Sequence, residues 1–98
     1  MNYNDFIKLT KKSNPSDILS DIHLALWHAM KNNWDMAHEI VQNINTETAF
    51  WIHAYLHRVE GDLNNANYWY NRANKTICTE SLESELNNII KSVFSYSV

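Results

Sequence analysis

The sequence predicts a small all-α protein. Its 98 residues include only one glycine and one proline, whereas the turns of a small β-sandwich require many of both. Apolar residues make up 45% of the chain, which is enough to form a core and argues against disorder. Most of them recur at spacings of three and four, the period of an amphipathic helix. A chain of this length forms one domain, so we expect residues 1–98 to fold as a single helical unit.

Two helices are expected on either side of the proline. The first covers residues 3–12, carries Phe6, Ile7 and Leu9, and ends at the Ser-Asn-Pro segment 13–15. The second covers residues 16–31, and its apolar face consists of Ile18, Ile22, Ala25, Leu26 and Ala29.

A third and a fourth helix are expected in the middle of the chain. The third covers residues 34–43, after a turn at Asn32 and Asn33 whose side chains can accept hydrogen bonds from the first amides. Its inner face consists of Trp34, Ala37, Ile40, Val41 and Ile44. Thr46 is expected to cap a fourth helix over residues 47–59, which Gly61 ends.

Two more helices are expected after Gly61. Asp62 caps the fifth, which runs to about residue 74 and directs Leu63, Ala66, Trp69, Tyr70 and Ala73 inward. The sixth covers about residues 79–95, and its apolar stripe consists of Leu82, Leu86, Ile89, Ile90, Val93 and Phe94. Its other side carries Glu, Asn, Ser and Lys and is expected to face water. Such a one-sided terminal helix closes the last apolar face of a helical array.

The chain repeats itself with a period of about 29 residues. Shifted by this amount, three pairs of identical residues align: Ala25 with Ala54, His28 with His57, and Ala37 with Ala66. Two helices approach closely only where a small side chain meets the neighbouring helix and a large one fills the space beside it. We therefore expect two tandem antiparallel hairpins, residues 17–45 and 46–74, between an N-terminal and a C-terminal capping helix.

This spacing resembles that of the tetratricopeptide and Sel1-like helical repeats. The clearest match is EGDLNNANYWYNRA, where the positions of the repeat are held by Gly61, Ala66, Tyr70 and Ala73. The chain differs in having His28 and His57 at aromatic positions, in lacking the helix-ending proline, and in its period, which is shorter than the usual 34 or so. The resemblance covers about residues 17–74 and implies a right-handed, α-solenoid-like array that binds other proteins. The stretch HAYLHRVEGDLNNANYWY is also similar to small uncharacterised bacterial proteins, which implies no particular activity.

The overall composition excludes several functional classes. A net charge of −3 leaves no surplus of positive charge for phosphates, so we expect no nucleic-acid partner. No apolar run approaches the roughly 18 residues of a membrane span, and the start of the chain does not read as a signal peptide. The single cysteine, Cys78, cannot form an internal disulfide. These features predict a soluble, cytoplasmic protein.

The motifs of catalysis are missing from the sequence. His38 and Glu39 are adjacent and point in different directions on a helix, and Cys78 has no neighbouring histidine. The chain also contains no glycine-rich phosphate loop. We therefore expect neither catalytic residues nor a cofactor.

A binding surface for a protein or peptide is expected on one side of the second and fourth helices. It consists of Ile22, Leu26, Trp51, Tyr55 and Arg58, and Trp, Tyr and Arg are the residue types enriched at binding hot spots. An apolar surface of this kind must be covered, either by the first helix or by a partner, a second copy of the chain included. An ion pair between Arg58 and Asp62 would compete with a binding role for Arg58.

A metal site is the alternative function. His53 and His57 are one helical turn apart, with Glu60 further along the same face, and this spacing can hold zinc or iron. Further ligands would come from His28, His38 or Glu39 across the hairpin. The simpler interpretation is that His28 and His57 pack as equivalent rings, each bonded to a carbonyl or a neighbouring side chain.

Overall fold

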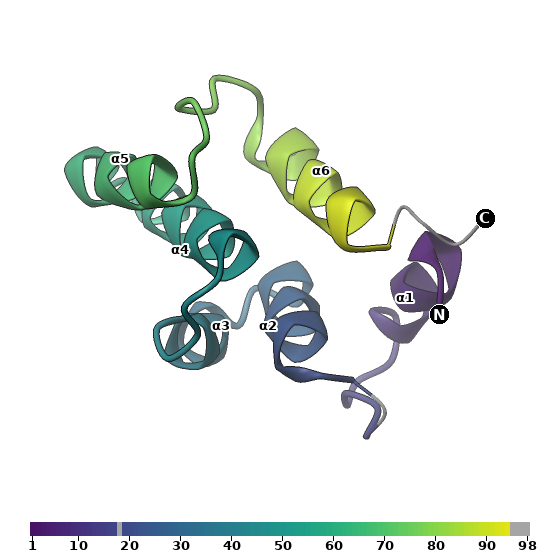
Figure 1. Cartoon of the computed structure of the whole chain (residues 1–98). Coiled ribbons are helices and arrows are strands. Elements are labelled where there is room, and N and C mark those ends of the chain that lie inside the picture. Colours follow the sequence, from purple (N-terminus) through teal and green to yellow (C-terminus); the bar gives the residue numbers. More distant parts are fainter. Residues whose placement is uncertain (18, 95–98) are drawn as a thin grey trace.

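The protein is built from helices, as predicted. The computed structural model describes residues 1–17 and 19–94, and within these residues all regular secondary structure is helical. Six helices follow one another (Figure 1): α1 (Tyr3–Leu9), α2 (Asp21–Met30), α3 (Trp34–Val41), α4 (Glu47–Val59), α5 (Leu63–Arg72) and α6 (Leu82–Phe94). In this part of the chain, no helix has the length and apolar character needed to cross a membrane.

α4 begins and ends at the predicted residues, and α5 begins directly after its predicted cap. Thr46 Oγ1 accepts a hydrogen bond of 3.1 Å from the amide of Ala49, and Asp62 Oδ1 accepts one of 3.3 Å from the amide of Asn65. Both bonds satisfy amides that a helix start leaves without a partner. The two predicted caps are therefore confirmed.

The start of α2 was predicted wrongly. The helix begins at Asp21, five residues later than expected, because the backbone at Ser20 is extended (φ −72°, ψ 173°). The preceding segment is rich in Ser and Asp, whose side chains compete with helical hydrogen bonds. Ile18, which we placed on the apolar face of this helix, lies outside the described residues.

The turns after α2 and α4 share one geometry. Asn32 and Gly61, 29 residues apart, both have positive φ, +60° and +84°. The next amide then returns to the carbonyl of a histidine, from Asn33 to His28 at 2.8 Å and from Asp62 to His57 at 2.9 Å. This is the bond of a Schellman helix end, which favours glycine or asparagine at the positive-φ residue. Asn33 differs from the prediction, because its side chain makes no capping bond within the described chain.

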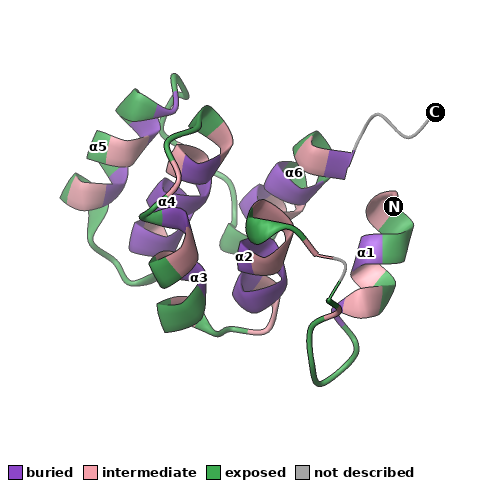
Figure 2. Cartoon of the chain, turned by 60° about the horizontal axis from the view of Figure 1, so that its bottom comes forward, coloured by how far each residue is buried: buried purple, intermediate pink, exposed green. Residues whose placement is uncertain are grey.

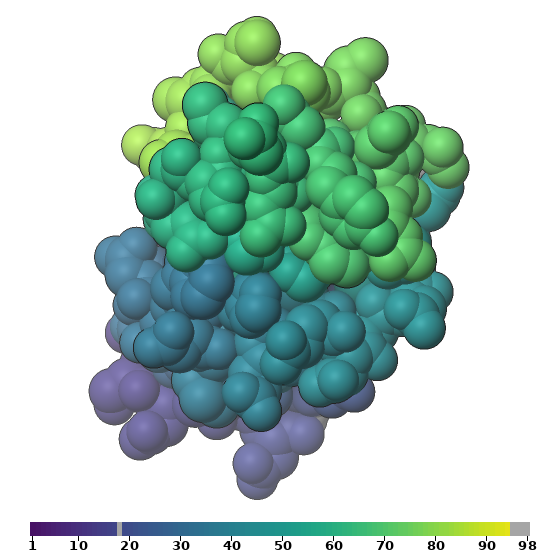
Figure 3. All heavy atoms as spheres, turned by 90° about the vertical axis from the view of Figure 1, so that its left-hand side faces the viewer, coloured from purple at the N-terminus to yellow at the C-terminus, as the bar shows by residue number. Residues whose placement is uncertain are grey.

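The most extensive helix contacts pair α2 with α3 and α4 with α5. Ala54, Ala66 and Tyr70 form a buried cluster of their own, while Ala25 and Ala37 belong to the main core. Figure 3 shows the side of the molecule on which α3 and α5 lie. The small residues predicted to permit close helix packing are thus buried.

The remaining helices, α1 and α6, complete the core. α6 packs on α4, α1 packs on α6, and the buried faces of the helices point toward one another (Figure 2). Phe6 stacks on Phe94 with ring centroids 4.8 Å apart, and the indole of Trp27 donates a 2.9 Å bond to the carbonyl of Leu9. Two leucines were placed on inner faces wrongly: Leu63 is 60% exposed and Leu82 is 38% exposed, each at the first position of its helix.

Candidate functional site

The residues predicted to line a binding surface face the interior. Leu26 and Tyr55 are buried, and Ile22, Trp51 and Arg58 are half-buried. The chain covers this surface itself, with α6 lying on α4. The sequence pointed to the first helix or a partner as the cover, whereas the first helix packs mainly against α6.

A buried carboxylate joins α6 to this surface. Glu85 is 1% exposed and accepts hydrogen bonds from three side chains: Tyr70 Oη at 2.6 Å, Arg58 Nη1 at 2.9 Å and Trp51 Nε1 at 3.0 Å. A buried charge is tolerated only when it is paired and hydrogen-bonded, and these donors meet that requirement. The pKa of the Tyr70 phenol is raised by burial and by its bond to Glu85, so the phenol keeps its proton.

Two expectations fail at Glu85. We placed the polar side of the sixth helix in water, and we considered Asp62 as the ion-pair partner of Arg58. In the structure Arg58 pairs with Glu85 instead and also donates to the carbonyl of Glu80. One signal was present in the sequence, because Glu85 lies three residues after Leu82 and four before Ile89, within the apolar stripe.

Three histidines form a second cluster, between α3 and α4. The ring centroids of His38 and His53 are 4.7 Å apart, those of His53 and His57 4.9 Å, and those of His38 and His57 5.3 Å. Each ring offers one nitrogen, and the three nitrogens lie within 4.8 Å of one another. The predicted His53 and His57 pair is therefore joined by a third imidazole from the neighbouring helix.

The other candidate ligands do not complete this group. His28 Nδ1 lies 3.2 Å from Asn33 Nδ2, and His57 Nδ1 lies 2.5 Å from Glu60 Oε1. Both histidines thus bond to a neighbouring side chain, as the packing interpretation predicted. The expected equivalence of the two rings is wrong, because His28 packs against Trp27 whereas His57 packs against Trp34 and the other two histidines. Glu60 contacts the cluster through His57.

Tryptophan rings hold the histidines in place. His38 stacks on Trp34 with a centroid distance of 4.7 Å and an interplanar angle of 10°, and His53 stacks on Trp69 at 3.9 Å and 12°. Trp34 is itself fixed by a 2.6 Å hydrogen bond from its indole to the carbonyl of Leu56. These contacts restrict the rings to a narrow range of orientations.

His53 is the least satisfied member of the cluster. It is 4% exposed, and among the described residues its Nδ1 has no hydrogen-bond partner. A buried polar atom without a partner costs about 1–3 kcal/mol. Burial, together with His38 and His57, lowers the pKa of His53 from 6.5 to about 4. His53 is therefore neutral at physiological pH and offers a lone pair.

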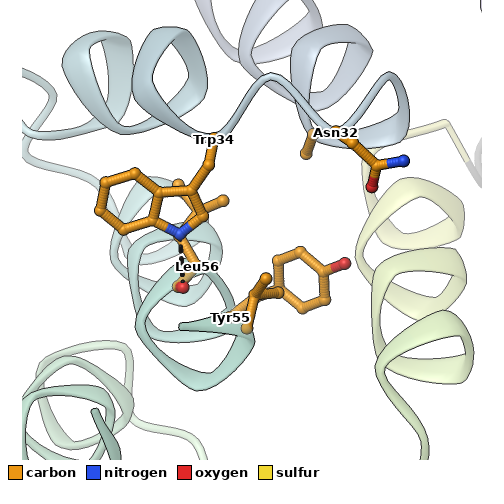
Figure 4. A pocket seen from close by; sticks show the side chains of 6 residues that line it. Asn32, Trp34, Tyr55 and Leu56 are labelled. Atoms are coloured by element: carbon orange, nitrogen blue, oxygen red, sulfur yellow. Dashed lines mark hydrogen bonds between the residues drawn. The ribbon is translucent and has the colours of Figure 1, made fainter. Parts of the chain in front are cut away.

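A small pocket opens between the turn after α2 and the end of α4 (Figure 4). Its volume is about 100 Å³, and it is lined by Ala29, Asn32, Trp34, Tyr55, Leu56 and Val59. The ring of Tyr55 lines this space opposite Trp34, while Val59 is 41% exposed. Of the five predicted binding residues, Tyr55 is the one that lines this opening.

Comparisons with known proteins add no further constraint. No family model matches the chain, and neither a curated protein nor a solved structure matches it. The resemblance to tetratricopeptide and Sel1-like repeats therefore stays a prediction.

Proposed function

We propose that the chain is a small, non-catalytic protein-interaction module made of two tandem helix hairpins with capping helices. The matching turns at Asn32 and Gly61 support the tandem arrangement, because the same 29-residue shift relates their backbone conformations and their hydrogen bonds. Trp34 and Leu63 are related by the same shift. Trp34 bonds to the second hairpin, whereas Leu63 is 60% exposed, as expected where an array of hairpins ends.

The pocket beside Trp34 carries the functional part of the proposal. An apolar cavity of about 150 Å³ accepts a benzene-sized molecule, so a pocket of about 100 Å³ suits one aliphatic side chain. Trp34 and Tyr55 belong to the residue types that dominate binding hot spots. The exposed amide of Asn32 offers a donor and an acceptor to the backbone of a partner. The partner is thus a protein or peptide that presents a projecting aliphatic side chain.

A charge at the rim of the pocket tests this function. Val59→Arg places a guanidinium at the pocket without disturbing the core, because Val59 is 41% exposed. Met36→Arg is the matched control, since Met36 is 51% exposed on α3 and does not line the pocket. Tagged wild type and both variants are used for affinity capture from cells of the source organism, followed by quantitative mass spectrometry.

The wild type and Met36→Arg are expected to enrich the same partner. Val59→Arg is expected to reduce its recovery about tenfold or more, which corresponds to a loss of about 1.4 kcal/mol or more in binding free energy. Equal recovery with all three proteins, or no enriched partner with the wild type, would show that the pocket is not a binding site.

A further inference from the structure

The histidine cluster has a feature that helix packing does not require. A leucine or phenylalanine at position 53 would fill apolar space without leaving a buried nitrogen unpaired. The chain instead places three imidazoles together and leaves Nδ1 of His53 without a partner among the described residues. We propose that His38, His53 and His57 bind one divalent transition-metal ion of the zinc class.

The distances between the rings fit such an ion after a small adjustment. Imidazole nitrogens bind Zn²⁺ at about 2.0–2.1 Å, so two nitrogens on a tetrahedral ion lie about 3.3 Å apart. The three ring nitrogens lie within 4.8 Å of one another, and no pair has to approach by more than about 1.5 Å. Closing this gap requires His38 and His53 to shift within their stacks on Trp34 and Trp69.

The protonation state of His38 and His53 also fits metal binding, because a histidine ligand must be neutral. Burial is the main cause that lowers the pKa values of both His38 and His53, and His57 lowers both further. At His38 the carboxylates of Glu60, Asp35 and Glu39 partly offset this shift. A cation that accepts lone pairs from the three rings supplies the partner that Nδ1 of His53 lacks among the described residues.

Glu60 lies outside the cluster and contacts it through His57. Its Oε1 lies 2.5 Å from His57 Nδ1, which leaves Nε2 of His57 available for an ion. Histidines that bind metals usually donate their other ring N–H to a carboxylate, which fixes the ring and raises its basicity. Glu60, which the sequence suggested as a ligand, is thus assigned the role of orienting His57.

The donor set defines the class of ion. Three imidazoles suit zinc, copper, nickel or cobalt, and they do not suit magnesium or calcium, which prefer oxygen ligands. Among the described residues, His38, His53 and His57 supply three ligands. A fourth position remains for water, which can approach from the side of the half-buried His38.

Titration of untagged, EDTA-treated protein with ZnCl₂ tests the site by calorimetry. The wild type is expected to bind one equivalent with a Kd of about 1 μM or tighter. His38→Gln removes the half-buried ligand and is expected to weaken binding more than 100-fold, which exceeds the loss of about 10–100-fold expected for the orienting partner in Glu60→Gln. His23→Gln is the matched control, because His23 lies outside the cluster against Phe94, and it is expected to bind like the wild type.

Two further measurements keep the result interpretable. Circular dichroism of each metal-free variant shows whether it folds. If His38→Gln does not fold, Glu60→Gln still tests the site, because the Glu60 side chain is 40% exposed and its substitution is not expected to unfold the protein. Co²⁺ in place of Zn²⁺ is expected to give the visible absorption of a four-coordinate ion. The absence of saturable binding by the wild type would overturn the proposal, as would equal affinities of the wild type, His38→Gln and Glu60→Gln. Loss of binding in His23→Gln alone would place the ion elsewhere.

Discussion

Arg58 and Glu85 form an ion pair between α4 and α6, with 2.9 Å between Nη1 and Oε1. The carboxylate is buried, whereas 17% of the arginine side chain remains exposed. Since Trp51 and Tyr70 donate to the other carboxylate oxygen, this single acidic residue connects α6 to both α4 and α5. The position of α6 therefore depends on the three hydrogen bonds of one buried polar residue as well as on its apolar stripe.

Removal of this carboxylate is expected to destabilise the protein strongly. Glu85→Ala removes the carboxylate that pairs with Arg58 and takes away the acceptor of two further donors, and breaking a buried ion pair costs about 3–5 kcal/mol. The free energy of unfolding is measured by urea titration. Glu83→Ala, an exposed site on the same helix, is the control and is expected to change stability by less than about 0.5 kcal/mol. Similar losses in the two variants would refute a special role for Glu85.

A milder change tests the Tyr70 bond on its own. Tyr70→Phe keeps the ring, which is 1% exposed, and removes only the hydroxyl that donates to Glu85 at 2.6 Å. Hydrogen bonds to charged groups contribute about 1.5–3 kcal/mol, so a loss in this range is expected in the same urea experiment. In the background of Glu85→Ala, the same substitution is expected to cost much less. Equal costs in both backgrounds would mean that the two side chains are not coupled.

The stability of the metal-free protein is expected to fall as the pH is lowered from 6.5 toward 4. His53 takes up a proton near pH 6.5 when unfolded but only near pH 4 when folded, so protons favour the unfolded chain in this window. This residue alone accounts for at most about 3 kcal/mol. Urea titrations in EDTA at several pH values, with His53→Phe as the control, measure the contribution. An NMR titration in which the His53 ring of the folded protein changes near pH 6.5 would contradict it.

The turn at Gly61 offers a test of backbone conformation. Its φ is +84°, and apart from the glycine and its two chain neighbours no heavy atom of the described residues lies within 4 Å of an added Cβ, so a substitution is costly for conformational reasons alone. Gly61→Ala is expected to lose about 1–2 kcal/mol, since positive φ is unfavourable for alanine. Gly61→Asn is expected to lose less, because Asn32 adopts the equivalent conformation with φ +60°. Thermal and urea unfolding measure both, and a larger loss for asparagine would refute the equivalence of the two turns.

Local signals in the sequence were sufficient for the fold class and for several helix ends. Thr46 and Asp62 each cap a helix by bonding an amide only three residues away, so the local sequence was sufficient to predict both caps. The alanines at positions 54 and 66 were also placed correctly, because a small side chain on an apolar face has few other roles. Leu63 was misplaced, since the apolar period does not show where the neighbouring helices end.

The candidate sites depended on contacts between distant segments. The sequence suggested His28, His38 and Glu39 equally as partners of His53 and His57, and only the way α3 packs on α4 selects His38. The burial of Glu85 depends in the same way on the position of α6. Helix periodicity determines which face of a helix is apolar, but it does not determine which other helix will cover that face.

The place of α6 in the core also affects how the protein is made. A ribosome completes α1 to α5 before it adds the helix that covers Trp51 and Tyr55, and it adds Phe94, against which Phe6 stacks, at the end of that helix. Until then the nascent chain exposes much of its apolar surface to solvent. Chaperone binding and degradation are therefore expected to act most strongly on chains that stall between α5 and α6.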